Sequence, residues 1–237
     1  MFKIIGAHML ALPLLVIGLT GASRAEPVQW AGSTLPSLTG IIGAPDGTII
    51  AGLPATITSF QPAISYPGLS TLLGISPATL SRIDVIGFEF NGGSPAPSGG
   101  WESSRWRFTD GVHSLTVDFS ELVGASVPAA VVGNGSLSAA AYNLFFSVQT
   151  PRSDTVMSYL LFDLPDTIDL DSPTFAITVA SGQSVGLPGE GTPDPDAIGI
   201  VRHVPEPGTI SMVLAGLWFW RITRKRRITS NGTNCLS

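Results

Sequence analysis

The chain has 237 residues, and its 12 lysines and arginines against 17 aspartates and glutamates give a formal net charge of −5 at neutral pH. All 17 acidic residues lie between Glu26 and Glu206, where only five arginines and no lysine occur, so this part alone carries a net charge of −12. Such a surface repels nucleic acids and anionic headgroups, which argues against a nucleic-acid partner. Because the single cysteine is Cys235, no disulfide framework or thiolate zinc site is expected in this acidic part.

The N-terminus has the pattern of a secretory signal peptide over residues 1–25. An apolar run over residues 4–19 is followed by small residues at Ser23 and Ala25, the positions that signal peptidase requires. We expect export by the general secretion machinery and cleavage between Ala25 and Glu26. The alternative is an uncleaved N-terminal anchor.

Residues 26–190 are predicted to form one β-rich exported domain that folds alone as a disulfide-free monomer. Glycine and proline interrupt the sequence about every ten residues, and short runs of alternating apolar and polar residues lie between them. This pattern is typical of an all-β fold, an antiparallel β-sandwich or jelly roll. The predicted strands are 82–90, 106–108, 113–119, 142–148, 156–162 and 175–179, of which 156–162 is apolar on both sides and so central.

Other segments of this domain carry turn signals. Residues 26–54 are expected to give one or two irregular edge strands, and residues 91–100 a loop. One turn of helix is predicted over Ser76–Ser81, with Ser76 as its N-cap and Pro77 at its first position. The Gly/Pro-rich residues 191–203, the end of a polar stretch that starts at Ser181, are expected to be a linker.

Two groups of residues could bind a ligand. Trp101 and Trp106 lie beside Arg105 and Arg107, and aromatic rings on an exposed sheet face can stack on sugars, although the same alternation equally describes a strand with one buried face. Asp163, Asp166, Asp169 and Asp171 follow a predicted strand, and loop carboxylates of this kind can bind calcium. The alternative is a solvated acidic loop, because the spacing is not that of an EF-hand.

A hydrolase-like pattern also occurs near the C-terminal end of the domain. Gly182-Gln183-Ser184-Val185-Gly186 fits G-x-S-x-G, and Asp194 or Asp196 and then His203 follow in nucleophile–acid–base order. That motif needs a strand, a tight turn and a helix to expose the serine, and no such helix is predicted here. We therefore interpret the match as chance, and no catalytic residue is expected.

The C-terminal segment 204–227 has three ordered parts. The first is Pro205-Glu206-Pro207, and the second is an apolar helix predicted at about residues 208–222. The third is a basic cluster of Arg221, Arg224, Lys225, Arg226 and Arg227. The core of this helix, residues 209–220, gives about 18 Å against a bilayer core of about 30 Å, and arginine side chains that snorkel extend the span. Positive charge stays cytoplasmic, so the domain before the helix lies outside the inner membrane and residues 228–237 form a cytoplasmic tail.

This three-part tail resembles the PEP-CTERM sorting signal of bacterial exported proteins, a tail also labelled as an ice-binding protein C-terminal domain. The resemblance implies recognition and cleavage by an exosortase, a membrane transpeptidase, and an association with polysaccharide production. The chain departs from the pattern in its short helix and its ten-residue extension. We expect a non-enzymatic protein of the cell surface or extracellular matrix; the alternatives are a carbohydrate-binding jelly-roll module and, disfavoured, an extracellular hydrolase.

Overall fold

The computed structural model describes residues 25–32, 43–46, 55–91, 100–146, 156–189 and 192–202. The strands in these residues are β1 (Ala25–Gly32), β2 (Ala55–Ile57), β3 (Ser59–Phe60), β4 (Ile64–Pro67), β5 (Val85–Asn91), β6 (Ser104–Thr109), β7 (Ser114–Phe119), β8 (Val131–Ser138), β9 (Val156–Phe162), β10 (Ala176–Ser181) and β11 (Pro195–Val201). The helices are α1 (Leu69–Leu73), α2 (Pro77–Leu80), α3 (Ala139–Phe146) and a 3-10 helix, Gln183–Val185.

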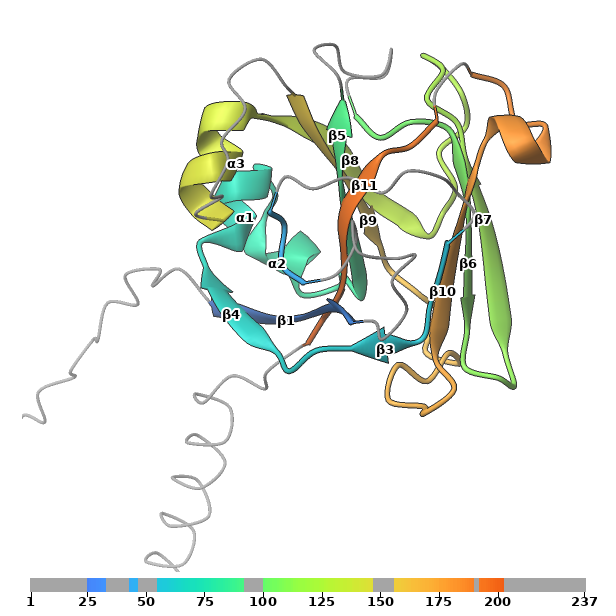
Figure 1. Ribbon diagram of the computed structural model, residues 1–237, viewed down its shortest axis with the longest axis horizontal. Helices are drawn as coiled ribbons and strands as arrows, with labels where there is room; N and C mark the ends of the chain where they lie inside the picture. The colour runs from blue at the N-terminus through green and yellow to red at the C-terminus, as the bar shows by residue number, and fades with distance from the viewer. Residues whose placement is uncertain are drawn as a thin grey trace, which may run out of the picture.

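The strands form two antiparallel sheets packed face to face. The larger sheet has the order β3-β1-β11-β5-β9-β8, with β4 also paired to β1, and the smaller has the order β2-β10-β6-β7. Figure 1 shows α1, α2 and α3 on one side of the larger sheet and the smaller sheet on the other. The all-β class predicted from the alternating pattern is thus confirmed.

Two hydrophobic cores lie on the two faces of the larger sheet. Between the sheets, Trp106 and Phe108 of β6 pack with Phe162 of β9 and other buried residues. On the other face, Trp30 and Phe88 pack with α3 and the other helices. Because both faces are covered, the central strands of this sheet are mostly apolar on both sides, with Glu89, Ser158 and Asp196 as buried polar exceptions.

Most of the predicted elements are present. Strands β5, β6, β7, β9 and β10 overlap the predicted ones, and β9 is central, between β5 and β8. The predicted helical turn is α2, where Ser76 Oγ accepts a hydrogen bond from the amide of Thr79 at 3.0 Å and Pro77 opens the helix. An N-cap serine followed by proline specifies the start of a helix through adjacent residues, so the helix could be predicted without knowledge of tertiary contacts.

The strand predicted at 142–148 is wrong. Residues 139–146 form helix α3, in which Tyr142 and Phe146, four residues apart, both pack on Phe88. Leu144, which the alternating pattern placed beside them, is 85% exposed. The run of alanines at 139–141 favours helix, and Ser138 Oγ accepts the amide hydrogen of Ala141 at 3.2 Å.

The predicted linker at 191–203 is also wrong. Residues 195–201 form β11, a fully buried strand that lies between β1 and β5. The glycine and proline content of this segment favoured a linker. Packing nevertheless requires a glycine at position 199, because a Cβ on Gly199 would lie 2.6 Å from Val28 and 2.8 Å from the ring of Trp30. The domain therefore extends to Arg202, and residues 26–54 supply the interior strand β1 rather than edge strands alone.

The position of β11 leads to a test of the domain boundary. A fragment of residues 26–190 lacks the strand that joins β1, β3 and β4 to the rest of the larger sheet, so we expect it to remain unfolded. A fragment of residues 26–202 should give a strand-dominated circular dichroism spectrum and a cooperative thermal transition. Equal cooperative transitions for the two fragments would contradict the central position of β11.

Candidate functional site

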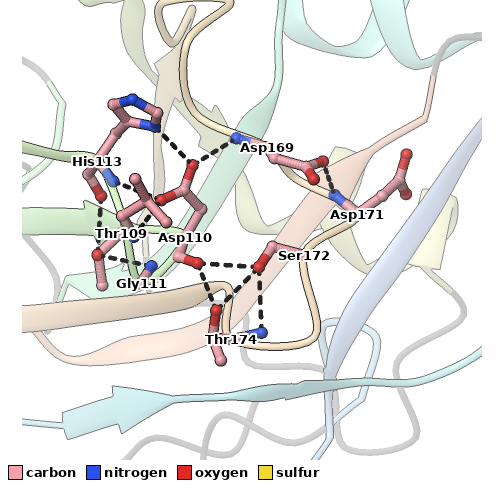
Figure 2. Close-up of polar contacts among 9 residues, drawn as sticks. Thr109, Asp110, Gly111, His113, Asp169, Asp171, Ser172 and Thr174 are labelled. Carbon is pink, nitrogen blue, oxygen red and sulfur yellow. Dashed lines mark hydrogen bonds and ion pairs between the residues drawn. The ribbon is translucent and has the colours of Figure 1, made fainter.

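The acidic loop, residues 163–171, is anchored by a residue that the sequence did not single out. Asp110 follows β6 and is 5% exposed. Its carboxylate accepts hydrogen bonds from the amides of Val112 at 2.7 Å, His113 at 2.6 Å and Asp169 at 3.1 Å (Figure 2). These donors, with the His113 ring at 3.2 Å, hold the pKa of Asp110 well below its usual range.

The backbone of Asp110 binds the same loop region. Its carbonyl accepts hydrogen bonds from the hydroxyls of Ser172, at 2.9 Å, and Thr174. Asp169 in turn accepts the amide hydrogen of Asp171 at 2.9 Å, as Figure 2 shows. Asp110 therefore joins the β6–β7 turn to the segment between β9 and β10.

The four aspartates of the acidic loop do not converge. Asp163 pairs with Arg82 at 2.5 Å, and Asp171 pairs with Arg202 at 2.6 Å. Three of them, Asp166, Asp169 and Asp171, line a surface hollow of about 390 Å³ that Asp84 and Arg202 also line. Within the ranges that the structure describes, no group of three or more His, Cys, Asp or Glu residues is placed to hold a metal ion. Calcium binding stays a prediction, and the contacts present are those of a loop held by ion pairs and amides.

The tryptophans predicted as a sugar platform lie in the core. Trp101 and Trp106 are each 0% exposed, and their rings meet edge to face with centroids 5.2 Å apart between the sheets. A buried ring cannot stack on a polysaccharide, so this part of the carbohydrate prediction is wrong. The alternation put Arg105 and Arg107, not the aromatic rings, on the outer face of β6.

The hydrolase-like residues are not assembled either. Ser184 lies in the 3-10 helix, where its hydroxyl donates to the carbonyl of Ser181 at 2.7 Å. Asp196 is buried in β11 and accepts a hydrogen bond from the Tyr142 hydroxyl of α3. Burial, followed by the charge of Asp196, raises the pKa of Tyr142 and keeps it protonated as that donor. His203 lies outside the described residues.

The structure reveals a second acidic site, at the opposite end of β6, that the sequence analysis missed. Its members are Glu89, Glu102, Glu121 and Asp194, here called the carboxylate cluster. They come from β5 and from the segments just before β6, just after β7 and just before β11. Glu89 Oε1 accepts the amide hydrogen of Glu102 at 2.8 Å, whereas Oε2 of Glu89 and Oε2 of Glu102 are buried without a hydrogen-bond partner. Glu89 lies on the same inward-facing side of β5 as Val85 and Gly87. A glutamate on the inward side of an otherwise apolar strand is the feature of the sequence that could have predicted this cluster.

Packing encloses the carboxylate cluster. Glu89 is 0% and Glu121 3% exposed. The hydroxyl of Ser103 accepts the amide hydrogen of Glu121 at 3.0 Å and donates to the carbonyl of Pro188 at 2.8 Å, which draws the loop 186–189 over the cluster. At Gly189, where φ is 124°, a Cβ would lie 2.7 Å from Glu121 Oε1, so only glycine fits this close cover.

Burial and mutual repulsion favour protons on this cluster. Burial, then the charge of Glu102, raises the pKa of Glu89 well above its usual range. Burial, then the charges of Glu121 and Asp194, raises the pKa of Glu102 to about 7. Burial also raises the pKa of Asp194. Chemically the cluster can bind protons, and its two buried members, Glu89 and Glu121, are closed to solvent.

Comparisons of the chain with family models, with curated proteins and with solved structures found no match. The sorting motif Pro205-Glu206-Pro207 and the basic cluster lie outside the described residues, whereas Ala25 and Glu26 of the expected cleavage site are the first two residues of β1. Within the described residues, no helix is both long and apolar enough to cross a bilayer.

Asp110 gives a first pH-dependent prediction. Its folded pKa is depressed, so its stabilising effect is present above the unfolded value of about 3.9 and is lost as the pH falls below it. In Asp110→Asn, an amide nitrogen would face amide donors, so we expect a lower unfolding midpoint at pH 7 and a smaller difference from wild type at pH 3. Asp166→Asn, on the exposed part of the acidic loop, is the control and should match wild type.

Glu89 gives a prediction of opposite sign. Its folded pKa is raised, so its stabilising effect is complete below the unfolded value of about 4.3 and is lost as the pH rises through the folded value. We expect the wild-type thermal midpoint to fall between pH 5 and pH 8, and Glu89→Gln to be more stable than wild type at pH 8 with a flatter profile. A Glu89→Gln variant that is less stable at pH 8 would mean that Glu89 is ionised and neutralised by a cation.

Proposed function

We propose that this protein is an exported, C-terminally sorted protein of the cell surface or extracellular matrix, without catalytic activity. The observation that carries the proposal is the order of three parts in residues 204–227: a Pro-Glu-Pro motif, an apolar segment and a basic cluster. Each part alone is common. A sorting enzyme requires the motif, and retention in the membrane requires an apolar helix followed by positive charge, so the three parts in this order serve both. The signal-peptide pattern at residues 1–25 supports the same route.

The arrangement of the two ends of the domain supports this proposal. Strands β1 and β11 are antiparallel neighbours, with Val28 opposite Val201, and the amide of Arg202 donates to the carbonyl of Pro27 at 2.7 Å. The expected cleavage site and the start of the sorting tail therefore leave the domain at one end. A protein held first by its signal peptide and then by its tail would keep that end towards the membrane.

Chain length between the domain and the motif adds a constraint. Pro205 follows Arg202 by three residues, which span at most about 10 Å when extended. Arg202 is held by Gln29 at 2.7 Å and Asp171 at 2.6 Å. A sorting enzyme that reads Pro205-Glu206-Pro207 would therefore work close to the folded domain, at the end that bears the acidic loop.

The carboxylate cluster does not favour the hydrolase alternative. Its most perturbed member, Glu89, is fully buried, and general acid–base catalysis requires reach to a substrate proton. The carbohydrate-binding alternative, as a jelly-roll module, loses its tryptophan platform but retains the outer face of the smaller sheet.

The proposal is tested by replacing Glu206 with alanine in the native host. The wild-type chain should lose about 30 residues after export, seen as a gel shift, and the Glu206→Ala chain should keep them while remaining in the membrane fraction. Neutral replacements of Arg224, Lys225, Arg226 and Arg227 should release the chain into the periplasm or medium, because nothing then holds the helix end in the cytoplasm.

The matched control is Glu190→Ala, the same substitution upstream of the motif, which should be processed like wild type. Intact Met1 on the exported protein would contradict the expected cleavage before Glu26. Processing of the Glu206→Ala and neutralised chains as in wild type would reduce the tail to a simple membrane anchor and overturn the sorting proposal.

A further inference from the structure

The outer face of the smaller sheet is polar, whereas its inner face forms the core. Its outward residues are hydroxyl-bearing, small or charged: Thr56, Thr178, Ala180, Arg105, Arg107, Thr109, Ser114, Thr116 and Asp118. Helices α1, α2 and α3 lie on the far side of the larger sheet and so do not cover this face (Figure 1). The face therefore offers hydrogen-bonding groups on a regular lattice of strands.

Arg107 stands apart from the other arginines in the described ranges. Arg82 pairs with Asp163, Arg105 with Asp118 and Arg202 with Asp171. Arg107 is exposed and, among the residues that the structure describes, makes no ion pair or side-chain hydrogen bond. Among the arginines that the structure describes, Arg107 is thus the one without a counter-charge.

The cross-strand neighbours of Arg107 are threonines. Thr178 of β10 and Thr116 of β7 are its register partners, and Thr56 of β2 lies beyond Thr178. The hydroxyls of Thr56 and Thr178 are 3.0 Å apart. This row crosses four strands, about 14 Å at the usual strand spacing. It presents hydroxyls on both sides of one guanidinium.

The nearest acidic side chain on this face is already engaged. Asp118 accepts hydrogen bonds from Arg105 Nε at 2.6 Å and Nη2 at 2.8 Å, and the Arg105 hydrogen bond lowers its pKa. The bidentate geometry fixes both partners beside the row, so Asp118 is not a competing partner for Arg107. The guanidinium of Arg107 remains available to an anion from outside.

We propose that this row binds a carboxylated polysaccharide, a chain that contains uronic acids. A guanidinium recognises a carboxylate through two parallel hydrogen bonds, and flanking hydroxyls match the hydroxyls of adjacent sugar rings. A row on the open face of a sheet suits an extended polymer rather than a small molecule. The inference deepens and rests on the proposed function, which places the domain outside the cell.

Binding at one site is weak by this mechanism. An exposed charge pair contributes little by itself, and the net negative charge of the domain opposes a polyanion. The apparent affinity rises through multivalency when many domains bind one polymer or when one polymer offers many uronates to a domain. The contact is therefore suited to retention in a matrix rather than to capture of a free sugar.

The test uses the full chain in a neutral detergent and affinity electrophoresis through gels that contain polygalacturonate or, as a neutral polymer, dextran. We expect retardation by polygalacturonate alone. Arg107→Gln should weaken it about fivefold or more, the loss of one charge-assisted contact, and Arg107→Lys should fall between, because lysine keeps the charge without the fork. Arg82→Gln is the matched control, since it removes the same charge and leaves the row intact.

Equal retardation of Arg107→Gln and wild type would overturn the proposal, as would an equal loss in Arg82→Gln or equal retardation by dextran. Circular dichroism of each variant ensures that a loss of binding is not a loss of fold. The sorting experiment is independent: tail processing without polygalacturonate binding would leave the proposed function standing and refute this site. Polygalacturonate binding by a chain that is not exported would support this site and refute the proposed function.

Discussion

The fold depends on one constraint, the insertion of the last described strand between the first strand and the rest of the larger sheet. Strand β11 pairs with β1 on one edge and β5 on the other, so it joins the N-terminal strands to the centre of the domain. Gly199 permits this pairing because the ring of Trp30 occupies the space of its missing side chain. The domain can complete its core only when residues 195–201 are available to pair with β1 and β5.

The pKa values of buried acidic groups are shifted in opposite directions at the two ends of the sandwich. At the end where β6 finishes, Asp110 stays ionised because backbone amides donate to it, and arginines neutralise Asp163 and Asp171. At the other end, Glu89 is buried and Glu102 half-buried among other carboxylates, and burial and mutual repulsion raise the pKa of both. A lower pH therefore stabilises the end that holds the carboxylate cluster and destabilises the end that holds Asp110, in separate pH windows.

The alternation of strand β6 connects the core to the proposed ligand surface. Trp106 and Phe108 fill the space between the sheets, and the same two-residue period turns Arg105 and Arg107 outward. A register slip of one residue would bury the guanidiniums and expose the aromatic rings. The packing of the tryptophans thus fixes the position of Arg107 among threonines, although the tryptophans themselves do not meet solvent.

Local signals in the sequence determined the elements that need no distant partner. Ser76 and Pro77 specified the start of α2, and the alternation in 113–119 specified β7, because capping and period-2 burial are written in adjacent residues. Tertiary contacts decided the rest. The glycines and prolines of residues 191–203 are typical of a linker, and only pairing with β1 and β5, beside Trp30 and Phe88, makes a strand of them. The run from Tyr142 to Phe146 alternates like a strand, and only packing of both rings on Phe88 from one face makes it a helix. The carboxylate cluster likewise required the fold, since its members lie far apart in the chain and only the meeting of β5, β6, β7 and β11 at one end brings them together.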